Sequence, residues 1–132
     1  MLLDTIAAYG TGRRKSSIAR TWLSPGDGQF IVNDMPMKEY FARHMLSELA
    51  MRPLVATQLD GQVNVKAYVR GGGIAGQADA LRHAISNALA DMDDTYRGVL
   101  GPQGLLTRDP RAKERKKPFC RGARRRKQFS KR

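Results

Sequence analysis

The sequence GGGIAG at Gly71–Gly76 has the G-x-G-x-x-G spacing of a dinucleotide-binding loop. It lies between a predicted strand and a predicted helix, where glycines let a phosphate approach the backbone and the N–H groups of the helix start attract an anion. A dinucleotide fold also needs an acidic residue at the end of the next parallel strand. Asp91 instead falls at the end of the helix itself, and no second strand–helix–strand unit follows. We therefore reject nicotinamide or flavin binding and expect Gly71, Gly72 and Gly73 to contact phosphate, with a structural turn as the alternative.

A second phosphate-binding candidate is GTGRRKSS, from Gly10 to Ser17. Arg13, Arg14 and Lys15 can neutralise phosphates, while Ser16 and backbone N–H groups can donate hydrogen bonds to them. A solvated loop is the alternative interpretation. Together with the basic C-terminal segment described next, this stretch predicts a second point of contact with a polyanion.

The charge of the chain is concentrated at its C-terminus. The 132 residues carry a formal net charge of +12, and residues 107–132 hold 13 of the 24 Lys and Arg but only two of the 12 Asp and Glu. A nearly neutral globular domain, residues 1–106, is thus predicted to carry a basic tail, residues 107–132. Such a segment repels itself, cannot build a core and favours a polyanionic partner. Nucleic acid is the leading candidate.

Two alternatives for the tail remain open. It could be a solvated end without a function, or it could bind acidic lipid, although no amphipathic apolar stripe accompanies its charges. Three aromatic side chains lie in or beside basic stretches and could stack on bases or pack on a partner. They are Tyr9, Phe119 and Phe129.

Catalytic and metal-binding residues are scarce. His83 and Arg82 lie away from the apolar stripe of a predicted helix and are expected at the surface, as an RNA contact or as solvated residues, and spacing places no nucleophile or carboxylate beside them for catalysis. His44 is interpreted as an ordinary helix residue. With one cysteine, Cys120, and two histidines, the chain lacks the four ligands of a structural zinc site and cannot form an internal disulfide. No cofactor, small-molecule substrate or enzymatic activity is predicted.

The N-terminal sequence does not resemble a signal peptide, and no apolar run approaches the ~18 residues of a membrane span. We expect a soluble, cytoplasmic protein with no membrane partner.

The elements that must position these residues alternate in type. Strands are predicted near residues 17–23 and 30–32, with Ala19, Thr21 and Leu23 on one face. Residues 37–51 favour a helix, in one or two pieces, that ends before Pro53. Residues 54–58 and 63–70 then predict a hairpin.

The clearest helix runs from Ile74 to about Met92, with apolar residues at a period of 3.6. Asp79, Arg82, His83, Ser86 and Asn87 are predicted on its opposite half. One more short helix is favoured between residues 93 and 106. This order predicts an α+β domain of two layers, with helices on one face of a small sheet.

Four blocks in order resemble the bacterial form of the ninth small-subunit ribosomal protein family. They are YGTGRRKSSIAR, VRGGGIAGQADALRHAISNAL, GLLTRDPRAKERKK and ARRRKQFSKR, and the resemblance covers about Tyr9 to Arg132. It implies a two-layer sandwich, ribosomal protein S5 domain 2-like, with a mixed sheet, a left-handed β-α-β crossover and a long extended C-terminal tail. It also implies a structural, non-catalytic place in the head of the small subunit, among neighbouring head proteins and bound to the 3′ major domain of the small-subunit rRNA.

The resemblance assigns roles to individual residues. Those expected to contact rRNA are Arg13, Arg14, Lys15, Ser16, Gly71, Gly72, Gly73, Arg82, His83, Arg108, Arg111, Lys113, Arg115, Lys116, Lys117, Arg121, Arg124, Arg125, Arg126 and Lys127. Those expected to approach the anticodon stem-loop of P-site tRNA are Ser130, Lys131 and Arg132.

The chain departs from the family pattern in the middle of the tail. Phe119-Cys120 stands where Gly-Leu is common, Gly122 replaces a usual Lys, and Lys127 replaces a usual Pro. A rival interpretation is the protein component of ribonuclease P, which is also small and basic with a related crossover. Its central helix is dense with cations, whereas RHAISNA in this chain has one.

Overall fold

The computed structural model describes residues 8–59 and 61–106. They form a five-stranded mixed sheet with the order β1-β2-β5-β3-β4. The strands are β1 (Ala8–Arg14), β2 (Ser17–Pro25), β3 (Phe30–Val32), β4 (Met35–Pro36) and β5 (Val63–Arg70). β1, β2 and β5 are antiparallel neighbours, β4 is antiparallel to β3, and β3 runs parallel to β5.

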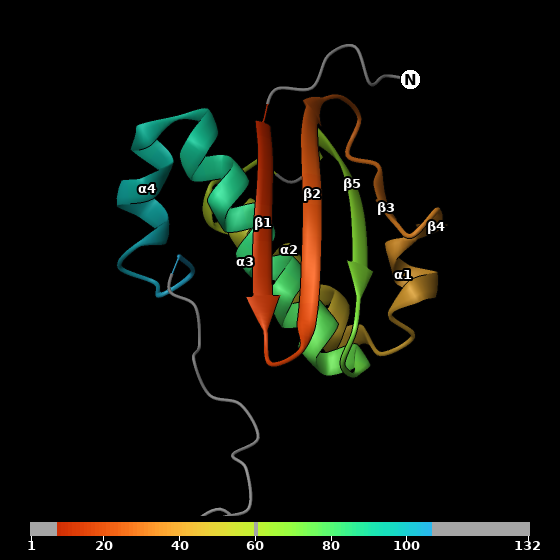
Figure 1. Cartoon of the computed structure of the whole chain (residues 1–132). Coiled ribbons are helices and arrows are strands. Elements are labelled where there is room, and N and C mark those ends of the chain that lie inside the picture. The colour runs from red at the N-terminus through yellow and green to blue at the C-terminus, as the bar shows by residue number, and fades with distance from the viewer. Residues whose placement is uncertain (1–7, 60, 107–132) are drawn as a thin grey trace, which may run out of the picture.

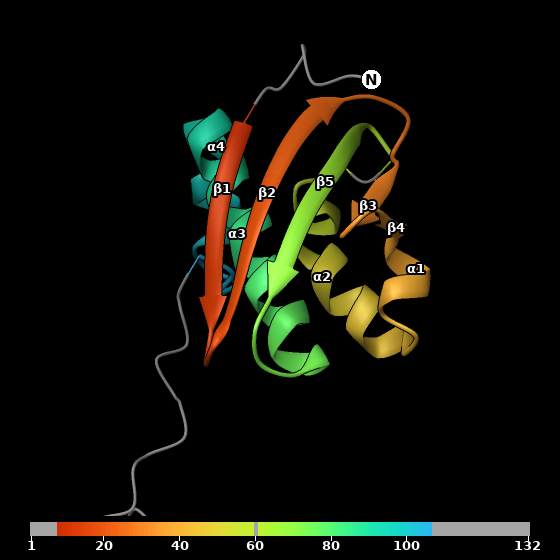
Figure 2. The same ribbon diagram turned by 45° about the vertical axis from the view of Figure 1, so that its right-hand side comes forward.

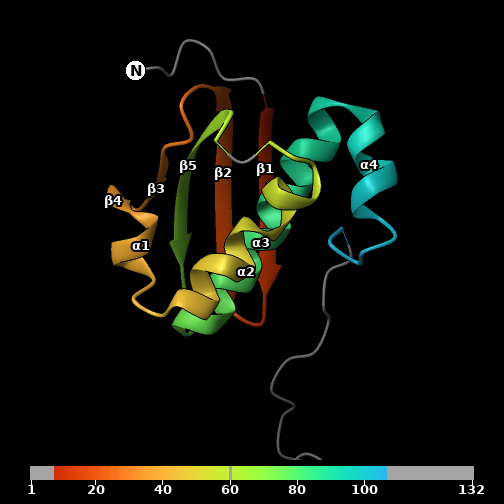
Figure 3. The same cartoon turned by 180° about the vertical axis from the view of Figure 1, so that it is seen from behind.

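The described residues also form four helices. They are α1 (Met37–Tyr40), α2 (His44–Ala56), α3 (Ile74–Met92) and α4 (Asp94–Leu100). α3 packs directly on β1 and β2, α2 packs on α3, and α1 lies beside β3 and β4 at one edge of the sheet. The view from behind shows α2 and α3 on the same face of the sheet (Figure 3). The predicted α+β fold with helices on one face is confirmed.

Buried and exposed residues alternate along the strands because one face of the sheet is buried against α3. In β2, Ala19, Thr21 and Leu23 are buried while the residues between them are partly or fully exposed. In β5, Val63, Val65, Ala67 and Val69 are buried in the same way. The predicted face of β2 is confirmed.

The close packing of β1 on α3 depends on two glycines. A Cβ on Gly12 would lie 2.2 Å from the Ala80 carbonyl oxygen, and one on Gly10 would lie 2.4 Å from that of Ala84. Ala80, Ala84 and Ala88 are all fully buried at this contact. Gly10 and Gly12 therefore serve strand–helix packing, and the interpretation of their stretch as a solvated glycine-rich loop is wrong, since Ala8–Arg14 is a strand.

Two predictions between residues 52 and 62 are wrong. α2 continues through Pro53 to Ala56, because the proline ring is buried in the core and tertiary packing outweighs its helix-breaking tendency. Residues 54–56 are thus the last turn of a helix, and β5 has no hairpin partner there. The β-branched Val55, which favoured a strand, is 56% exposed on the helix surface.

The predicted helix from Ile74 to Met92 is confirmed at both ends, but its polar half is not exposed as predicted. Arg82 and Ser86 are buried, with Ser86 fully enclosed. The sheet covers one side of α3, while α2, α4 and the chain at Leu105 pack against it elsewhere. Polar residues on this helix therefore bond internally. The short helix expected after residue 93 is α4, whose N-cap Asp93 accepts a hydrogen bond from the Thr95 N–H at 3.0 Å.

Candidate nucleic-acid interface

The two glycine-containing stretches meet at one end of the sheet. The turn between β1 and β2 and the turn between β5 and α3 lie side by side at the lower end of the views in Figures 1 and 2. Ser17 Oγ donates to the Gly71 carbonyl oxygen at 2.9 Å, which joins residues 54 positions apart. The structure thus brings together predicted residues that we call the turn cluster. Its members are Arg13, Lys15, Ser16, Gly71, Gly72 and Gly73.

Gly71 and Gly72 are required for the turn itself. Their φ values are +79° and +63°, a region that side chains disfavour. A Cβ on Gly71 would lie 2.5 Å from the Ser16 carbonyl oxygen, and one on Gly72 would lie 2.3 Å from Ser17 Oγ. The structural interpretation is therefore correct for these two glycines, and it sets the close approach of the two turns.

Gly73 differs from its neighbours because it faces open space. A Cβ there would meet no atom within 4 Å, and its φ is −96°. As the N-cap of the 19-residue α3 it offers no side-chain hydrogen bond to the first turn. The start of a helix without a side-chain cap leaves backbone N–H groups oriented toward solvent, where an anion can bind. Lys15, Ser16 and Arg13 are all exposed, and Ser16 lies directly beside Gly71 and Gly72.

Arg14 and Arg82 do not join the exposed cations of the turn cluster. Arg14 Nε lies 3.0 Å from Asp79 Oδ2, and Arg82 Nε lies 2.7 Å from Asp79 Oδ1. The two arginine side chains are only 14% and 9% exposed. Two guanidinium groups therefore share one carboxylate between β1 and α3, and the surface position predicted for Arg82 is wrong.

Arg82 and His83 instead hold the last described residues of the chain. Arg82 Nη1 donates to the Leu105 carbonyl oxygen at 3.0 Å, and His83 Nε2 lies 3.2 Å from the Leu106 carbonyl oxygen. Leu105 itself is buried. These contacts from α3 fix the point at which the basic segment 107–132 begins. Direct contact of Arg82 and His83 with RNA stays a prediction.

A further basic surface, which the sequence reasoning missed, lies on the face of the sheet that α3 does not cover. Alternation along β1, β2 and β5 places Arg13, Arg20, Lys66 and Arg70 there with three aromatic rings, Tyr9, Trp22 and Tyr68. None of the three strands contains Asp or Glu. Strand alternation could have revealed part of this surface, because Arg20, Lys66 and Arg70 each lie two residues from an aromatic ring on their own strand.

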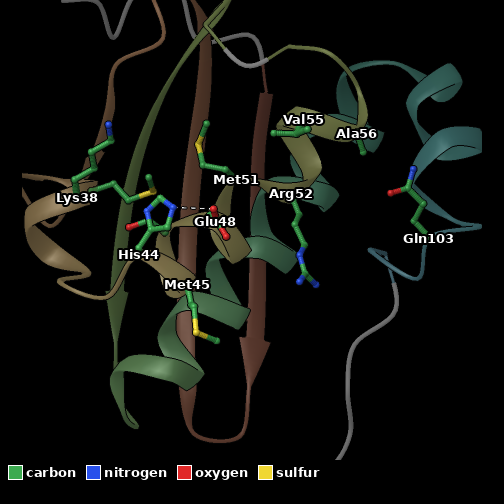
Figure 4. Close-up of a pocket in the computed structure, with 11 residues that line it drawn as sticks. Lys38, His44, Met45, Glu48, Met51, Arg52, Val55, Ala56 and Gln103 are labelled. Carbon is green, nitrogen blue, oxygen red and sulfur yellow. Dashed lines mark ion pairs between the residues drawn. The ribbon is translucent and has the colours of Figure 1, made fainter.

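A shallow hollow of about 750 Å³ lies over the outer surface of α2 (Figure 4). Met45, Met51 and Val55 give it an apolar wall, and an exposed His44–Glu48 ion pair of 2.8 Å crosses it. His44 is thus a helix residue, as predicted, and its side chain is exposed. The pair is solvated, and the Ser47 hydroxyl that also lines the hollow is buried and donates to the Phe41 carbonyl oxygen at 3.4 Å, so this surface does not suggest catalysis.

The remaining predicted site residues fall outside residues 8–59 and 61–106. They are Arg108, Arg111, Lys113, Arg115, Lys116, Lys117, Arg121, Arg124, Arg125, Arg126, Lys127, Ser130, Lys131 and Arg132. The same holds for Cys120 and for the division of the chain at residue 107. In the part of the chain that the structure describes, no helix has the length and apolar character to cross a bilayer, and no three acidic, His or Cys side chains are grouped to hold a metal ion.

The fold and these surfaces define a small basic α+β protein suited to binding a polyanion. Residues 12–132 match the family model for ribosomal protein S9/S16. The chain is also 56% identical over 124 residues to the "Small ribosomal subunit protein uS9" of Solidesulfovibrio magneticus, an alignment that covers 94% of this chain and 95% of that protein. The chain belongs to the ribosomal protein S9/S16 family, as its motifs indicated.

RNA binding is typical of this family, whose members are structural components of the ribosome. The family match favours the ribosomal interpretation over the ribonuclease P component.

Proposed function

We propose that this chain is a structural constituent of the small ribosomal subunit and binds the rRNA of the subunit head through the turn cluster and the basic tail. The observation that carries the proposal is the convergence of the two glycine-containing turns beside the exposed cations Arg13 and Lys15. Family membership and the similarity to a small-subunit protein support the same assignment.

The turn cluster supplies the three components that a phosphate site needs. Lys15 and Arg13 provide positive charge, Ser16 provides a hydroxyl donor, and the start of α3 at Gly73 provides oriented N–H groups. Ser17 is not available to a ligand, because it is buried and bonded to Gly71. Its role is to hold the two turns in register, which positions the groups around them.

The tail supplies most of the charge. Its 13 Lys and Arg would displace counterions from RNA phosphates, and arginine guanidinium groups would clamp phosphates through paired donors. The contacts of Arg82 and His83 with Leu105 and Leu106 support this role, since they hold the chain against α3 immediately before residue 107. We propose that Ser130, Lys131 and Arg132 reach the anticodon stem-loop of P-site tRNA.

The proposal extends to the topology and to partners. β3 and β5 are parallel neighbours, and the chain passes from one to the other by way of α1 and α2. This connection supports the left-handed β-α-β crossover of a ribosomal protein S5 domain 2-like fold. The apolar surface over α2 supports contact with neighbouring head proteins. We further propose that the protein acts in a cytoplasmic ribosome and has no small-molecule substrate.

Sedimentation of the tagged full-length chain in a cell lysate tests the subunit assignment. The protein is expected to migrate with small subunits at moderate salt. Migration with large subunits, or at the top of the gradient as free protein, would refute the assignment.

Deletion of Lys131 and Arg132 tests the tRNA assignment. Subunits carrying the shortened chain should assemble normally but release P-site tRNA at least about tenfold faster, the effect of losing one hydrogen bond between charged groups. An unchanged tRNA dissociation rate from otherwise normal subunits would disprove the tRNA contact while leaving the rRNA assignment intact.

A further inference from the structure

The face of the sheet opposite α3 carries a continuous row of aromatic rings. Tyr9 and Trp22 are paired across β1 and β2 with ring centroids 5.2 Å apart, and Trp22 and Tyr68 on β5 lie 5.8 Å apart in an edge-to-face arrangement. Tyr9 is 42% exposed, and the other two rings are half-buried. In Figures 1 and 2 every helix lies away from this side of β1, β2 and β5. Half-exposed rings of this kind offer their remaining surface to a planar ligand.

Cations surround the aromatic row. The Arg20 guanidinium lies 5.6 Å from the Trp22 ring centroid, and the Lys66 ammonium lies 5.7 Å from that of Tyr68. Arg13 and Arg70 occupy the same face at the end near the turn cluster, as the pairing of Ile18 with both residues shows. Positive charge therefore continues from the turn cluster across the sheet.

A hollow of about 410 Å³ lies in this face between β2, β5 and the turn after β3. Its walls are formed by Ile18, Arg20, Asn33, Tyr68, Val69 and Arg70. The volume falls in the range of about 300–1,000 Å³ typical of small-ligand sites. Two guanidinium groups at its edge and one aromatic ring in its wall match the two parts of a nucleotide, which are an anionic phosphate and a planar base.

We propose that the open face of the sheet is a binding site for single-stranded RNA, in which an unpaired base stacks on Tyr68 in this hollow and Arg20 and Arg70 bind the adjoining phosphates. Trp22 and Tyr9 extend the stacking surface toward the next nucleotide. The inference rests on the proposed RNA-binding function and deepens it, because it adds a base-stacking surface to phosphate contacts at the turn cluster and tail.

Charge complementarity favours RNA over a protein as the occupant. Four cations share the face, and β1, β2 and β5, the strands that carry them, contain no acidic residue. One carboxylate contacts the face from outside these strands: Tyr68 Oη donates to Oδ1 of Asp34, in the turn after β3, at 3.4 Å. That contact orients the Tyr68 ring without neutralising Arg20 or Arg70. A duplex fits less well, since its bases are already stacked and cannot reach the rings.

The single tryptophan of the chain makes the site directly observable. The full-length protein is titrated with an unstructured RNA of about ten nucleotides, within the range that one such surface binds. Trp22 fluorescence reports binding at the sheet, and the anisotropy of a dye on the RNA reports binding anywhere on the protein. The expected result is saturable quenching of Trp22, with less quenching by a duplex of the same length.

Two sheet-face variants and one matched control complete the test. Tyr68→Leu should weaken the binding reported by Trp22 by about fivefold or more, the effect of removing one base stack. The double variant Arg20→Gln with Arg70→Gln should weaken this binding at least as much. It should also lower the salt slope, the steepness with which the logarithm of RNA affinity falls with the logarithm of salt concentration, by about 1.4, the effect of two single-strand phosphate contacts. Arg43→Gln with Arg52→Gln makes the same charge change at exposed positions near or on α2 and should leave it unchanged. Circular dichroism verifies that each variant is folded.

Anisotropy separates failure of this inference from failure of the proposed function. If RNA binds but Trp22 is not quenched, or if the sheet-face and control variants behave alike, the sheet-face site is wrong and the proposed function stands. If no RNA binds, the proposed function itself fails. If the sheet-face variants bind RNA normally but no longer enter small subunits, the face contacts a protein and the inference is overturned.

Discussion

Substitution of Gly12 by alanine tests how closely β1 approaches α3. The added Cβ would lie 2.2 Å from the Ala80 carbonyl oxygen and 2.3 Å from the Ala84 nitrogen, where ordinary contacts begin at 3.4 Å. Both atoms belong to the helix backbone, so no side-chain rotation can relieve the clash. The strand and α3 must separate by about 1 Å, a gap that forfeits a quarter to a half of each van der Waals contact along the interface.

The cost follows from that separation. Overpacking a core costs about 1–3 kcal/mol, and we expect about 3 kcal/mol for Gly12→Ala because backbone must move against backbone. For a domain of this size the melting temperature should fall by roughly 12–24 °C. Gly98→Ala is the matched control, since Gly98 lies inside α4 and a Cβ there meets no atom within 4 Å. That change should raise the free energy of unfolding by about 0.5–1 kcal/mol through helix propensity.

Urea unfolding followed by Trp22 fluorescence measures both variants. Trp22 lies on β2, next to the strand that carries Gly12, and it reports loss of the sheet. If Gly12→Ala were as stable as the original protein, the packing of β1 on α3 described above would be incorrect. Equal destabilisation by Gly98→Ala would mean that any added methyl group is harmful, and the geometric explanation would lose its support.

Two further substitutions probe the ion pairs and the turn cluster. Asp79→Asn removes the carboxylate that the largely buried Arg14 and Arg82 share. It should lower the free energy of unfolding, measured by urea titration, by about 3 kcal/mol. A loss below about 0.5 kcal/mol would show that the two ion pairs contribute as little as exposed pairs do. Arg13→Gln with Lys15→Gln should lower the salt slope of duplex RNA binding by about 1.8 while stability stays unchanged, and a slope no lower than that of the Arg43→Gln with Arg52→Gln control would remove the turn cluster from the interface.

Strand alternation and helix periodicity were sufficient to predict the elements that cross the core. The buried faces of β2 and β5 and the limits of α3 follow from the spacing of apolar residues. Prediction failed at residues 52–58, because Pro53 and Val55 have local preferences that tertiary packing overrides. A pattern along one segment does not contain the partner against which that segment packs.

The candidate site was predictable only in part for the same reason. The glycine and basic motifs identified the members of the turn cluster, but not that Ser17 and Gly71 join them across 54 residues. Arg82 was assigned to the surface because a helical wheel shows one layer of neighbours, whereas Asp79 and Leu105 enclose it. The full extent of the basic aromatic surface on the open face of the sheet was missed, because β1, β2 and β5 come side by side only through strand pairing.

The most direct test of the RNA-binding account compares the salt dependence of RNA affinity for the full chain and for a chain that ends at Leu106. The shortened chain keeps the carbonyl groups of Leu105 and Leu106 that Arg82 and His83 contact. Because residues 107–132 carry 13 cations, and each neutralised duplex phosphate adds about 0.9 to the slope, the full chain should lose affinity with salt more steeply by several units. Equal slopes for the two folded proteins would contradict the account, since the tail would then make no net contribution to phosphate binding.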